Sequence, residues 1–317
     1  MNSTRDTPAP SGKGPRRQAS AWWHVGLIAW GATMLLPLAF MLTTALSSAD
    51  EAMAPTESLR EMLWPASWQW DNFAEVWRAV PFLRYYLNSL GVALVATLGQ
   101  VLTSASAAYA FARLEWRGRD AVFLTYLATM MIPHSVTMIP NFIALRFIPD
   151  LLADALPWVD WAGMRYAGDV PVGRLAGLDS YFALCAPAMF SAYGTFMLRQ
   201  FFQSIPRSLD EAARIDGAGN WTIFSRVILP LALPGLTTLT ILTFMSVWGS
   251  FLWPLIVTNH HYLHTLPVGL QAFHGQYGTE WHLMMAASLL MLLPVLVVFL
   301  AGQRFFVSGA ALGAMKG

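Results

Sequence analysis

The chain has 317 residues, of which 56% are hydrophobic and 12% are charged, and its net charge is +1. A soluble domain carries about a quarter charged residues, so this composition is typical of a membrane protein. The near-neutral charge argues against a nucleic-acid partner. The single cysteine, Cys185, excludes an internal disulfide and a metal site built from several thiolates.

Six runs without Asp, Glu, Lys or Arg mark the candidate membrane spans. A bilayer core about 30 Å thick needs roughly 20 apolar helical residues, and each run meets or nearly meets that length. We therefore expect an all-α membrane protein with six transmembrane helices. Their approximate ranges are 22–46, 86–110, 121–143, 180–202, 231–257 and 283–306.

The N-terminal residues 1–20 are rich in Pro, Ser, Gly and charge, so we expect a disordered tail followed by one transmembrane domain over 21–317. A cleaved signal peptide is the alternative for the first apolar run, because Arg16 and Arg17 precede it. That run is about twice as long as the usual apolar region of 7–15 residues, which favours a retained helix.

The distribution of charge sets the expected orientation. Most Lys and Arg residues fall in four segments: 1–17, 113–119, 199–226 and 304–317. Positively charged segments stay in the cytoplasm, so both termini are expected there. The acidic residues concentrate in the two outer segments, 47–84 and 146–178. The first of these is amphipathic and rich in Trp, so we expect it to lie along the outer membrane interface.

The second expected helix carries Thr97, Gln100 and Ser104 on one face. A polar face of this kind can line a path for a solute. Small polar residues also pack membrane helices together, and that alternative stays open.

Two prolines, Pro133 and Pro140, interrupt the third expected helix and predict a kink or a break. His134 follows the first and Asn141 follows the second. An ionisable residue at membrane depth is a functional candidate, so both residues are candidates for a substrate path. A neutral His that bonds a carbonyl freed by the kink is an equally good interpretation.

Three residues of the fifth expected helix, Trp248, Ser250 and Trp253, are further candidates for a substrate path, because aromatic faces can stack on the C–H surface of a solute. Tryptophan at a membrane interface is the ordinary alternative. His260, His261 and His264 follow in the next loop, but no carboxylate lies near them in sequence. We therefore expect no metal site. No catalytic set of residues is apparent, so an enzyme is not expected.

The inner loop between the fourth and fifth helices is built to fold locally. Ser208 and Glu211 have the spacing of a capping box, which satisfies the free amides at a helix start. Gly217 suits the left-handed position after a helix end. Asn220 can cap a second helix that stops near Pro230. The loop is therefore predicted to form a short helix, a glycine turn and a second helix on the cytoplasmic face.

Two adjacent small residues in this loop, Ala212 and Ala213, leave a flat surface that another protein's backbone can approach closely. An interfacial hairpin without a partner is the alternative, and it explains the caps but not the pair of alanines. A docking element is the better interpretation.

The stretch EAARIDGAGNWTIFSRVILP, residues 211–230, resembles the EAA loop of ATP-binding-cassette (ABC) importer permeases. The matching positions are Glu211, Ala212, Ala213, Gly217, Leu229 and Pro230. Val227 stands where the family has Ile. Shorter similarities occur at 88–89, 109–114, 131–133 and 251–255 and in the Gly-rich C-terminal tail. The resemblance covers about 22–317 and points to the smaller, six-helix permease subunit of the maltose type, a family of binding-protein-dependent carbohydrate importers.

The resemblance implies a role for each matched part. Residues 211–217 would form a coupling helix held by an ATPase subunit, with Arg214 and Asp216 as further contacts, and helices 2–6 would swing when two ATPases close. A second homologous permease and an extracytoplasmic binding protein would complete the assembly. The lysines, Lys13 and Lys316, lie in no phosphate-binding loop, so ATP and Mg²⁺ would be bound by the ATPases.

The resemblance implies import of a carbohydrate across the bacterial cytoplasmic membrane. Glycerol phosphate and polyols are alternative solutes, because related permeases share the loop. An ion-coupled secondary transporter is a more distant alternative. It would be expected to show paired intramembrane carboxylates or an inverted repeat, and the sequence shows neither.

Overall fold

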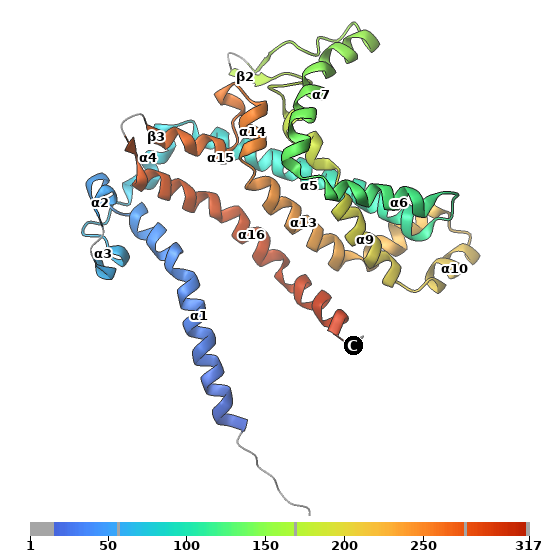
Figure 1. Cartoon of the computed structure of the whole chain (residues 1–317), viewed down its shortest axis with the longest axis horizontal. Helices are drawn as coiled ribbons and strands as arrows, with labels where there is room; N and C mark the ends of the chain where they lie inside the picture. Colours follow the sequence, from blue (N-terminus) through green and yellow to red (C-terminus); the bar gives the residue numbers. More distant parts are fainter. Residues whose placement is uncertain (1–15, 56–57, 168–169, 276–277, 315–317) are drawn as a thin grey trace, which may run out of the picture.

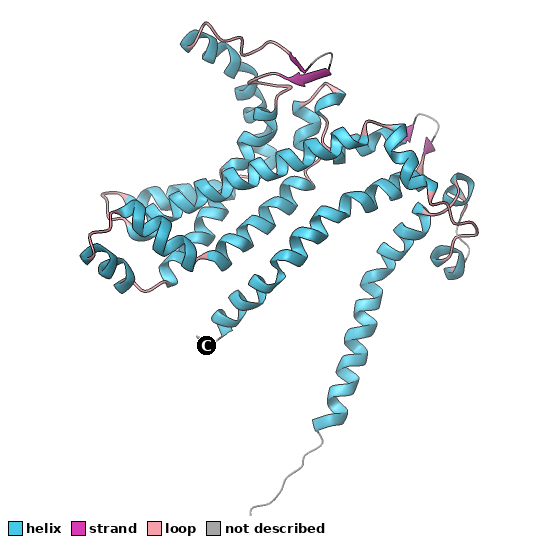
Figure 2. Ribbon diagram, turned by 180° about the vertical axis from the view of Figure 1, so that it is seen from behind, coloured by secondary structure: helices cyan, strands magenta, loops and turns pink. Residues whose placement is uncertain are grey.

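The computed structural model describes residues 16–55, 58–167, 170–275 and 278–314, and the protein is mainly helical (Figures 1 and 2). The first eight helices are α1 (Arg16–Ala45), α2 (Ala49–Met53), α3 (Leu59–Leu63), α4 (Asp71–Ala79), α5 (Phe82–Arg113), α6 (Arg119–Ala128), α7 (His134–Ala155) and α8 (Tyr181–Cys185). The others are α9 (Ala192–Ser204), α10 (Ser208–Ile215), α11 (Asn220–Thr222), α12 (Leu229–Leu231), α13 (Leu233–Trp248), α14 (Leu252–Val257), α15 (Leu266–Gly269) and α16 (Trp281–Ala314).

Four short 3₁₀ helices, one π-helix and two small antiparallel hairpins complete the described part of the chain. The 3₁₀ turns are η1 (Thr129–Met131), η2 (Ala186–Met189), η4 (His261–Leu263) and η5 (Leu270–Phe273), and η3 (Ile223–Ile228) is a π-helix. The antiparallel pairs are β1 (Arg165–Ala167) with β2 (Val170–Gly173), and β3 (His274–Gly275) with β4 (Gly278–Thr279).

Four described helices are long and apolar enough to cross a membrane: Trp22–Ala45, Phe82–Arg113, His134–Ala155 and Trp281–Gln303. Two bent helix pairs also qualify if each is one span. Tyr181–Met189 meets Ala192–Ser204 at 43°, and Asn220–Leu231 meets Leu233–Trp248 at 77°. The described residues therefore hold four to six candidate spans.

The centre of the molecule is formed by α5, α9 and α13, which pack together, while α16 lies along α13 (Figure 2). α1 stands apart from this body over most of its length, and the C-terminal end of α1 meets α16 (Figure 1). Its apolar side chains are exposed, with Trp22 78% and Ile28 71% accessible. A helix of this kind is suited to lipid or to another membrane helix, because neither surrounding is aqueous.

Three buried clusters hold the body together. The first cluster, near the start of α5, includes Phe82, Tyr85, Phe244, Trp248 and Leu283. A second, at the opposite end of α5, includes Tyr109, Leu198, Phe202, Phe224 and Ile228. A third, between them, includes Val92, Leu184, Trp253 and Val257.

The prediction of a single helix over 121–143 is wrong, because two helices, α6 and α7, occupy this range. The chain breaks at Pro133, as a proline there predicts, so α6 ends before it and α7 starts after it. Pro140 does not end α7, which continues to Ala155 into the segment 146–178 that was expected to be a loop. Arg146, Asp150 and Asp154 are spaced four residues apart and share one exposed helical face, so charge does not terminate the helix.

The fourth and fifth expected helices are also each broken. The range 180–202 divides into α8, η2 and α9, with Phe190 and Ser191 extended between them. The range 231–257 divides into α13 and α14, separated by Gly249, Ser250 and Phe251. Apolar composition predicts that a segment is long enough to span, but it does not show where the backbone leaves the helical path.

The helix ends also differ from the prediction. α1 begins at Arg16, so residues 16–20 are helical rather than disordered, and 1–15 lie outside the described residues. α5 and α16 are longer than the predicted ranges 86–110 and 283–306. The segment 47–84 contains three short helices. Three of its Trp side chains are exposed, and the Trp68 ring contacts the rings of Trp64 and Trp70. Its position on the membrane interface stays a prediction.

Candidate functional site

The loop between α9 and α13 begins with α10, whose first turn differs from the predicted capping box. Ser208 is the first helical residue rather than the cap, and Arg207 in the cap position is already in the right-handed helical region. The capping box is therefore wrong, because no side chain caps this helix start. The amides of Asp210 and Glu211 instead bond the Arg207 carbonyl, at 2.9 and 3.1 Å.

The end of α10 is a glycine-terminated turn, as predicted. Gly217 has a φ of +83°, which is the left-handed region that L side chains rarely adopt. Its amide bonds the Arg214 carbonyl at 3.0 Å, and the Ala218 amide bonds the Ala213 carbonyl at 2.9 Å. These two bonds form a Schellman motif, which satisfies carbonyls that a helix end leaves free. The turn gives α10 a defined end.

The second helix of the loop runs from α11 through the π-helix η3 into α12. Asn220 is its first residue rather than its cap, so the predicted capping role is wrong; Gly219 occupies the cap position. The Asn220 side-chain oxygen instead accepts a bond from Arg214 at 2.8 Å. The helix ends at Leu231, near Pro230 as predicted, and the chain turns at Ala232 into α13. Pro230 tolerates this position because it lies at the start of α12, after the wide turns of the π-helix.

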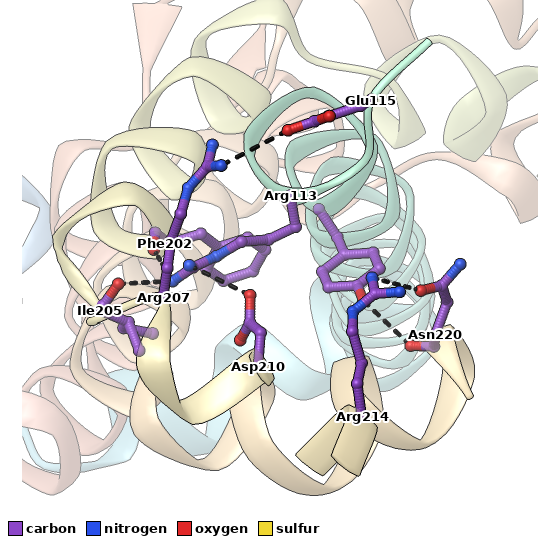
Figure 3. A network of polar contacts seen from close by, with 9 residues as sticks. Arg113, Glu115, Phe202, Ile205, Arg207, Asp210, Arg214 and Asn220 are labelled. Atoms are coloured by element: carbon purple, nitrogen blue, oxygen red, sulfur yellow. Dashed lines mark hydrogen bonds and ion pairs between the residues drawn. The ribbon is translucent and has the colours of Figure 1, made fainter. Parts of the chain in front are cut away.

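A buried arginine joins the loop to α5 (Figure 3). Arg113 at the end of α5 lies 3.2 Å from Asp210 and donates hydrogen bonds to the carbonyls of Phe202 and Ile205. Its side chain is 3% exposed, so this is an ion pair largely removed from water. The side chain therefore holds together the ends of α5 and α9 and the start of α10.

Two further contacts supplement this buried pair. Arg207 lies 3.6 Å from Glu115 with both side chains exposed (Figure 3). The hydroxyl of the buried Tyr109 donates to the Asn220 carbonyl at 3.1 Å. A cavity of about 560 Å³ opens among these residues, lined by Arg113, Asp210 and Arg214 among others. Sequence reasoning missed Arg113. The signal in the sequence that could have indicated this pair was a basic residue, Arg113, directly after an apolar run, together with an acidic residue, Asp210, near the start of the loop.

The loop presents a mixed apolar and charged outer surface. Glu211, Ala212, Asp216 and Gly217 are exposed, and Ile215 is 87% exposed. Ala213 is half-buried because it packs against the second core cluster. The two alanines therefore have different surroundings: Ala213 contacts the core, and Ala212 lies on the surface. Leu229 is half-buried and Pro230 exposed at the far end of the loop.

A second feature is a cavity of about 570 Å³ between α5, α9, α13 and α14. It brings together three predicted substrate-path residues, His134, Ser250 and Trp253. Gln100 of α5, predicted as part of a polar face, also lines it and donates to the Thr243 hydroxyl at 2.8 Å. The other two members of that face are buried, Thr97 at 5% and Ser104 at 1% exposure.

The two remaining substrate-path candidates do not line this cavity. Trp248 is 2% exposed in the first core cluster, where its indole nitrogen donates to the Met291 carbonyl at 3.0 Å. Its ring stacks on Phe244, so the structure gives it a packing role. Asn141 is half-buried on α7.

The loop after α14 is held by a buried carboxylate. The Asp179 carboxylate accepts hydrogen bonds from the amides of Asn259 and His260, at 2.6 and 3.3 Å. His264 is half-buried, and this burial lowers the pKa of its imidazole, with a smaller lowering effect from His261 and an opposing one from Asp179. Within the part of the chain that the structure describes, no group of three or more His, Cys, Asp or Glu side chains is placed to hold a metal.

Comparisons with known proteins identify related chains. A family model for the binding-protein-dependent transport system inner membrane component matches residues 100–310. The sn-glycerol-3-phosphate transport system permease protein UgpE of Pectobacterium atrosepticum is 33% identical over 304 residues, covering 93% of this chain and 96% of the relative. The arabinooligosaccharides transport system permease protein AraQ of Halalkalibacterium halodurans is 29% identical over 254 residues, covering 80% and 81% respectively.

A solved structure shares the fold. A chain of a bacterial ABC transporter involved in the import of the acidic polysaccharide alginate superposes with a TM-score of 0.72 at 22% identity. The match covers 95% of this chain and 100% of that chain. The helical architecture described above is therefore one that a membrane importer uses.

Proposed function

Because the chain belongs to the family of binding-protein-dependent transport system inner membrane components, we propose that it is the permease subunit of an ATP-driven ABC importer for a carbohydrate. The family is one of transport permeases rather than enzymes, and its members are multi-pass inner-membrane proteins. The observation that carries the proposal is the loop 206–231, a locally folded element that lies inside the matched region and exposes its outer surface.

In this proposal α10 is the coupling helix. The residues assigned to the contact with an ATPase subunit are Glu211, Ala212, Ala213, Arg214, Asp216, Gly217, Leu229 and Pro230. Glu211 and Ala212 offer a charge beside a small exposed surface, which suits a partner that approaches closely. Arg214 stabilises the loop by its hydrogen bond to Asn220, and Ala213 stabilises it by packing against the second core cluster. Movement of the partner would reach α5 through Arg113 and Asp210.

The described residues hold up to six candidate spans, which supports a six-span arrangement. In this proposal Asn220–Leu231, the first half of the second bent pair, belongs to the cytoplasmic loop, and Leu233–Trp248 continues with α14 as the fifth span. With six spans both termini lie on one side, and the positive-inside rule assigns that side to the cytoplasm. The Arg-rich loop containing α10 then faces the cytoplasm too, where ATP is available. The long outer segment 146–178, with its β1–β2 hairpin, would face the extracytoplasmic binding protein.

The partners in the proposal are a second homologous permease, two ATPase subunits and a binding protein. The exposed apolar length of α1 supports a membrane partner or lipid on that side. ATP and Mg²⁺ would be bound by the ATPase subunits, because the sequence of this chain contains no phosphate-binding loop.

The substrate is a carbohydrate in this proposal, and the name of one relative, a permease for arabinooligosaccharides, supports that class. Glycerol phosphate is the alternative because another relative is named for it, and a polyol is a third solute of similar size.

Purification of the tagged chain from its own membranes in mild detergent tests the proposal. We expect an ATP-binding-cassette ATPase and a second permease to co-purify, and the complex to take up solute only with ATP. Transport by the isolated chain along an ion gradient would contradict the proposal and favour a secondary transporter.

A further inference from the structure

We propose that the cavity between α5, α9, α13 and α14 is a solute site of this subunit, and that it takes an uncharged polyhydroxylated molecule rather than an organophosphate or an acidic sugar. This inference rests on the proposed function and narrows its substrate. The volume of about 570 Å³ lies within the range of small-molecule sites, about 300–1,000 Å³.

Both helix breaks of the central body open onto this cavity. Phe190 and Ser191, between η2 and α9, line it on one side, and Ser250, between α13 and α14, lines it on another. Non-helical backbone at membrane depth persists where it is buried in protein or faces a water-filled path. Broken helices also form the solute sites of many transporters. The breaks therefore mark this cavity as part of a path.

The polar lining consists of groups that both donate and accept hydrogen bonds. Gln100 and Thr243 are bonded to each other at 2.8 Å, which fixes their orientation on facing helices. Ser246 adds a hydroxyl to the same side of the cavity. Thr265 is 4% exposed, and its hydroxyl has no hydrogen-bond partner among the described residues. Hydroxyls and an amide are suited to the hydroxyl groups of a sugar or polyol, which also donate and accept.

The cavity lining lacks the charge that an anion would need. No Asp, Glu, Lys or Arg is among its described lining residues, and the ionisable side chains there are His134 and Tyr193. A phosphate monoester carries about 1.5–2 negative charges near neutral pH. Burial of such a charge without a cation is costly, and phosphate sites ordinarily use Arg or Lys. A helix start can also bind an anion through its free amides. At the start of α9 the Gly194 amide is already used, because it donates to the Ser191 hydroxyl at 3.0 Å.

Aromatic groups complete the match to a sugar. The Trp253 indole nitrogen donates to the Ala183 carbonyl at 3.0 Å, so its ring is held in place while it contributes to the lining. Tyr193 lines the cavity and is 47% exposed. Aromatic faces stack on the C–H surfaces of a sugar ring, which phosphate does not offer. The lining is thus amphipathic in the same way as a saccharide.

The test uses the intact transporter, with its own second permease, ATPases and binding protein, in proteoliposomes. The probes are radiolabelled maltose, arabinobiose and sorbitol, and sn-glycerol-3-phosphate. We expect ATP-driven uptake of at least one neutral probe and no uptake of the phosphate above background. ATP-driven uptake of glycerol-3-phosphate, or ATP hydrolysis without uptake of any neutral probe, would overturn the inference. Failure of any ATPase to associate is a distinct result that defeats the proposed function itself.

Variants of the lining test the site directly. Gln100→Leu and Ser246→Ala should each lower uptake of the neutral solute about fivefold or more, while the ATPases still co-purify in normal amounts. Thr238→Ala is the matched control, because the Thr238 hydroxyl bonds a carbonyl of its own helix α13, at Pro234, and lies outside the lining. The control should stay within about twofold of the wild type. Uptake by Ser246→Ala equal to that of the control would count against the site.

Discussion

Arg113 at the end of α5 and Asp210 at the start of α10 form an ion pair, with 3.2 Å between Arg113 Nη1 and Asp210 Oδ2. The two side chains are 3% and 12% exposed. The same guanidinium bonds carbonyls at the end of α9, so one side chain connects three helix ends. In the proposed mechanism, this link would transmit a displacement of α10 to α5 and α9.

Arg113→Leu should destabilise the protein strongly, because Asp210 is left buried without its partner. Removal of one member of a buried pair costs about 3–5 kcal/mol. Thermal unfolding of the purified complex measures this. The double variant with Asp210→Leu should recover part of the lost stability while transport stays low. Arg207→Leu is the control, because its pair with Glu115 is exposed and contributes about 0–1 kcal/mol. Equal losses in Arg113→Leu and Arg207→Leu would contradict the buried link.

Glu211→Lys should abolish transport while the protein still inserts in the membrane normally. Glu211 is exposed in the first turn of α10, so the fold does not depend on it, but the substitution reverses the charge on the proposed docking surface. Uptake and the amount of co-purified ATPase are the measurements. Gln203→Lys adds a positive charge on the neighbouring exposed end of α9 and should leave uptake close to wild type. Unchanged uptake by Glu211→Lys would remove α10 from the coupling role.

Gly217→Val should impair transport because a β-branched residue disfavours the φ of +83°. Open space surrounds the position, so the cost is conformational rather than steric, of the order of 1–3 kcal/mol. Gly217→Asn is the matched control, since Asn adopts the left-handed region more readily. We expect Asn to retain most uptake and Val to lose it. A Val variant as active as the Asn variant would show that the turn geometry is dispensable.

Acid should loosen the loop after α14 through His264. Burial lowers the pKa of this imidazole below its usual 6.5, so the unfolded chain binds the proton more readily. The contribution of His264 to stability is therefore complete above the ordinary pKa and declines as pH falls through and below it. Thermal unfolding between about pH 7.5 and 5 should show a shallower decline in His264→Gln than in the wild type. His260→Gln, at an exposed position, should follow the wild type; identical profiles for all three proteins would exclude the effect.

The sequence determined the class of protein and the local form of its loop. Long apolar runs predict membrane helices wherever they fold, because lipid leaves the backbone no other hydrogen-bond partner. The glycine turn at 217 follows from local backbone preference, and the structure confirms it. The break at Pro133 follows from the missing amide of proline. The resemblance of 211–230 to the EAA loop also needs no tertiary information.

Only the tertiary structure decided which polar groups meet. Arg113 and Asp210 are 97 residues apart in sequence, and neither shows by itself that it has a partner. Ser208 and Glu211, which have the spacing of a capping box, do not cap α10, whereas Asp210 between them contacts Arg113. Trp248 and Trp253 look alike in sequence, yet one packs in the core and the other lines a cavity. The physical reason is that helix breaks at 190–191 and 249–251 depend on how neighbouring helices pack, and those breaks decide which side chains face the path.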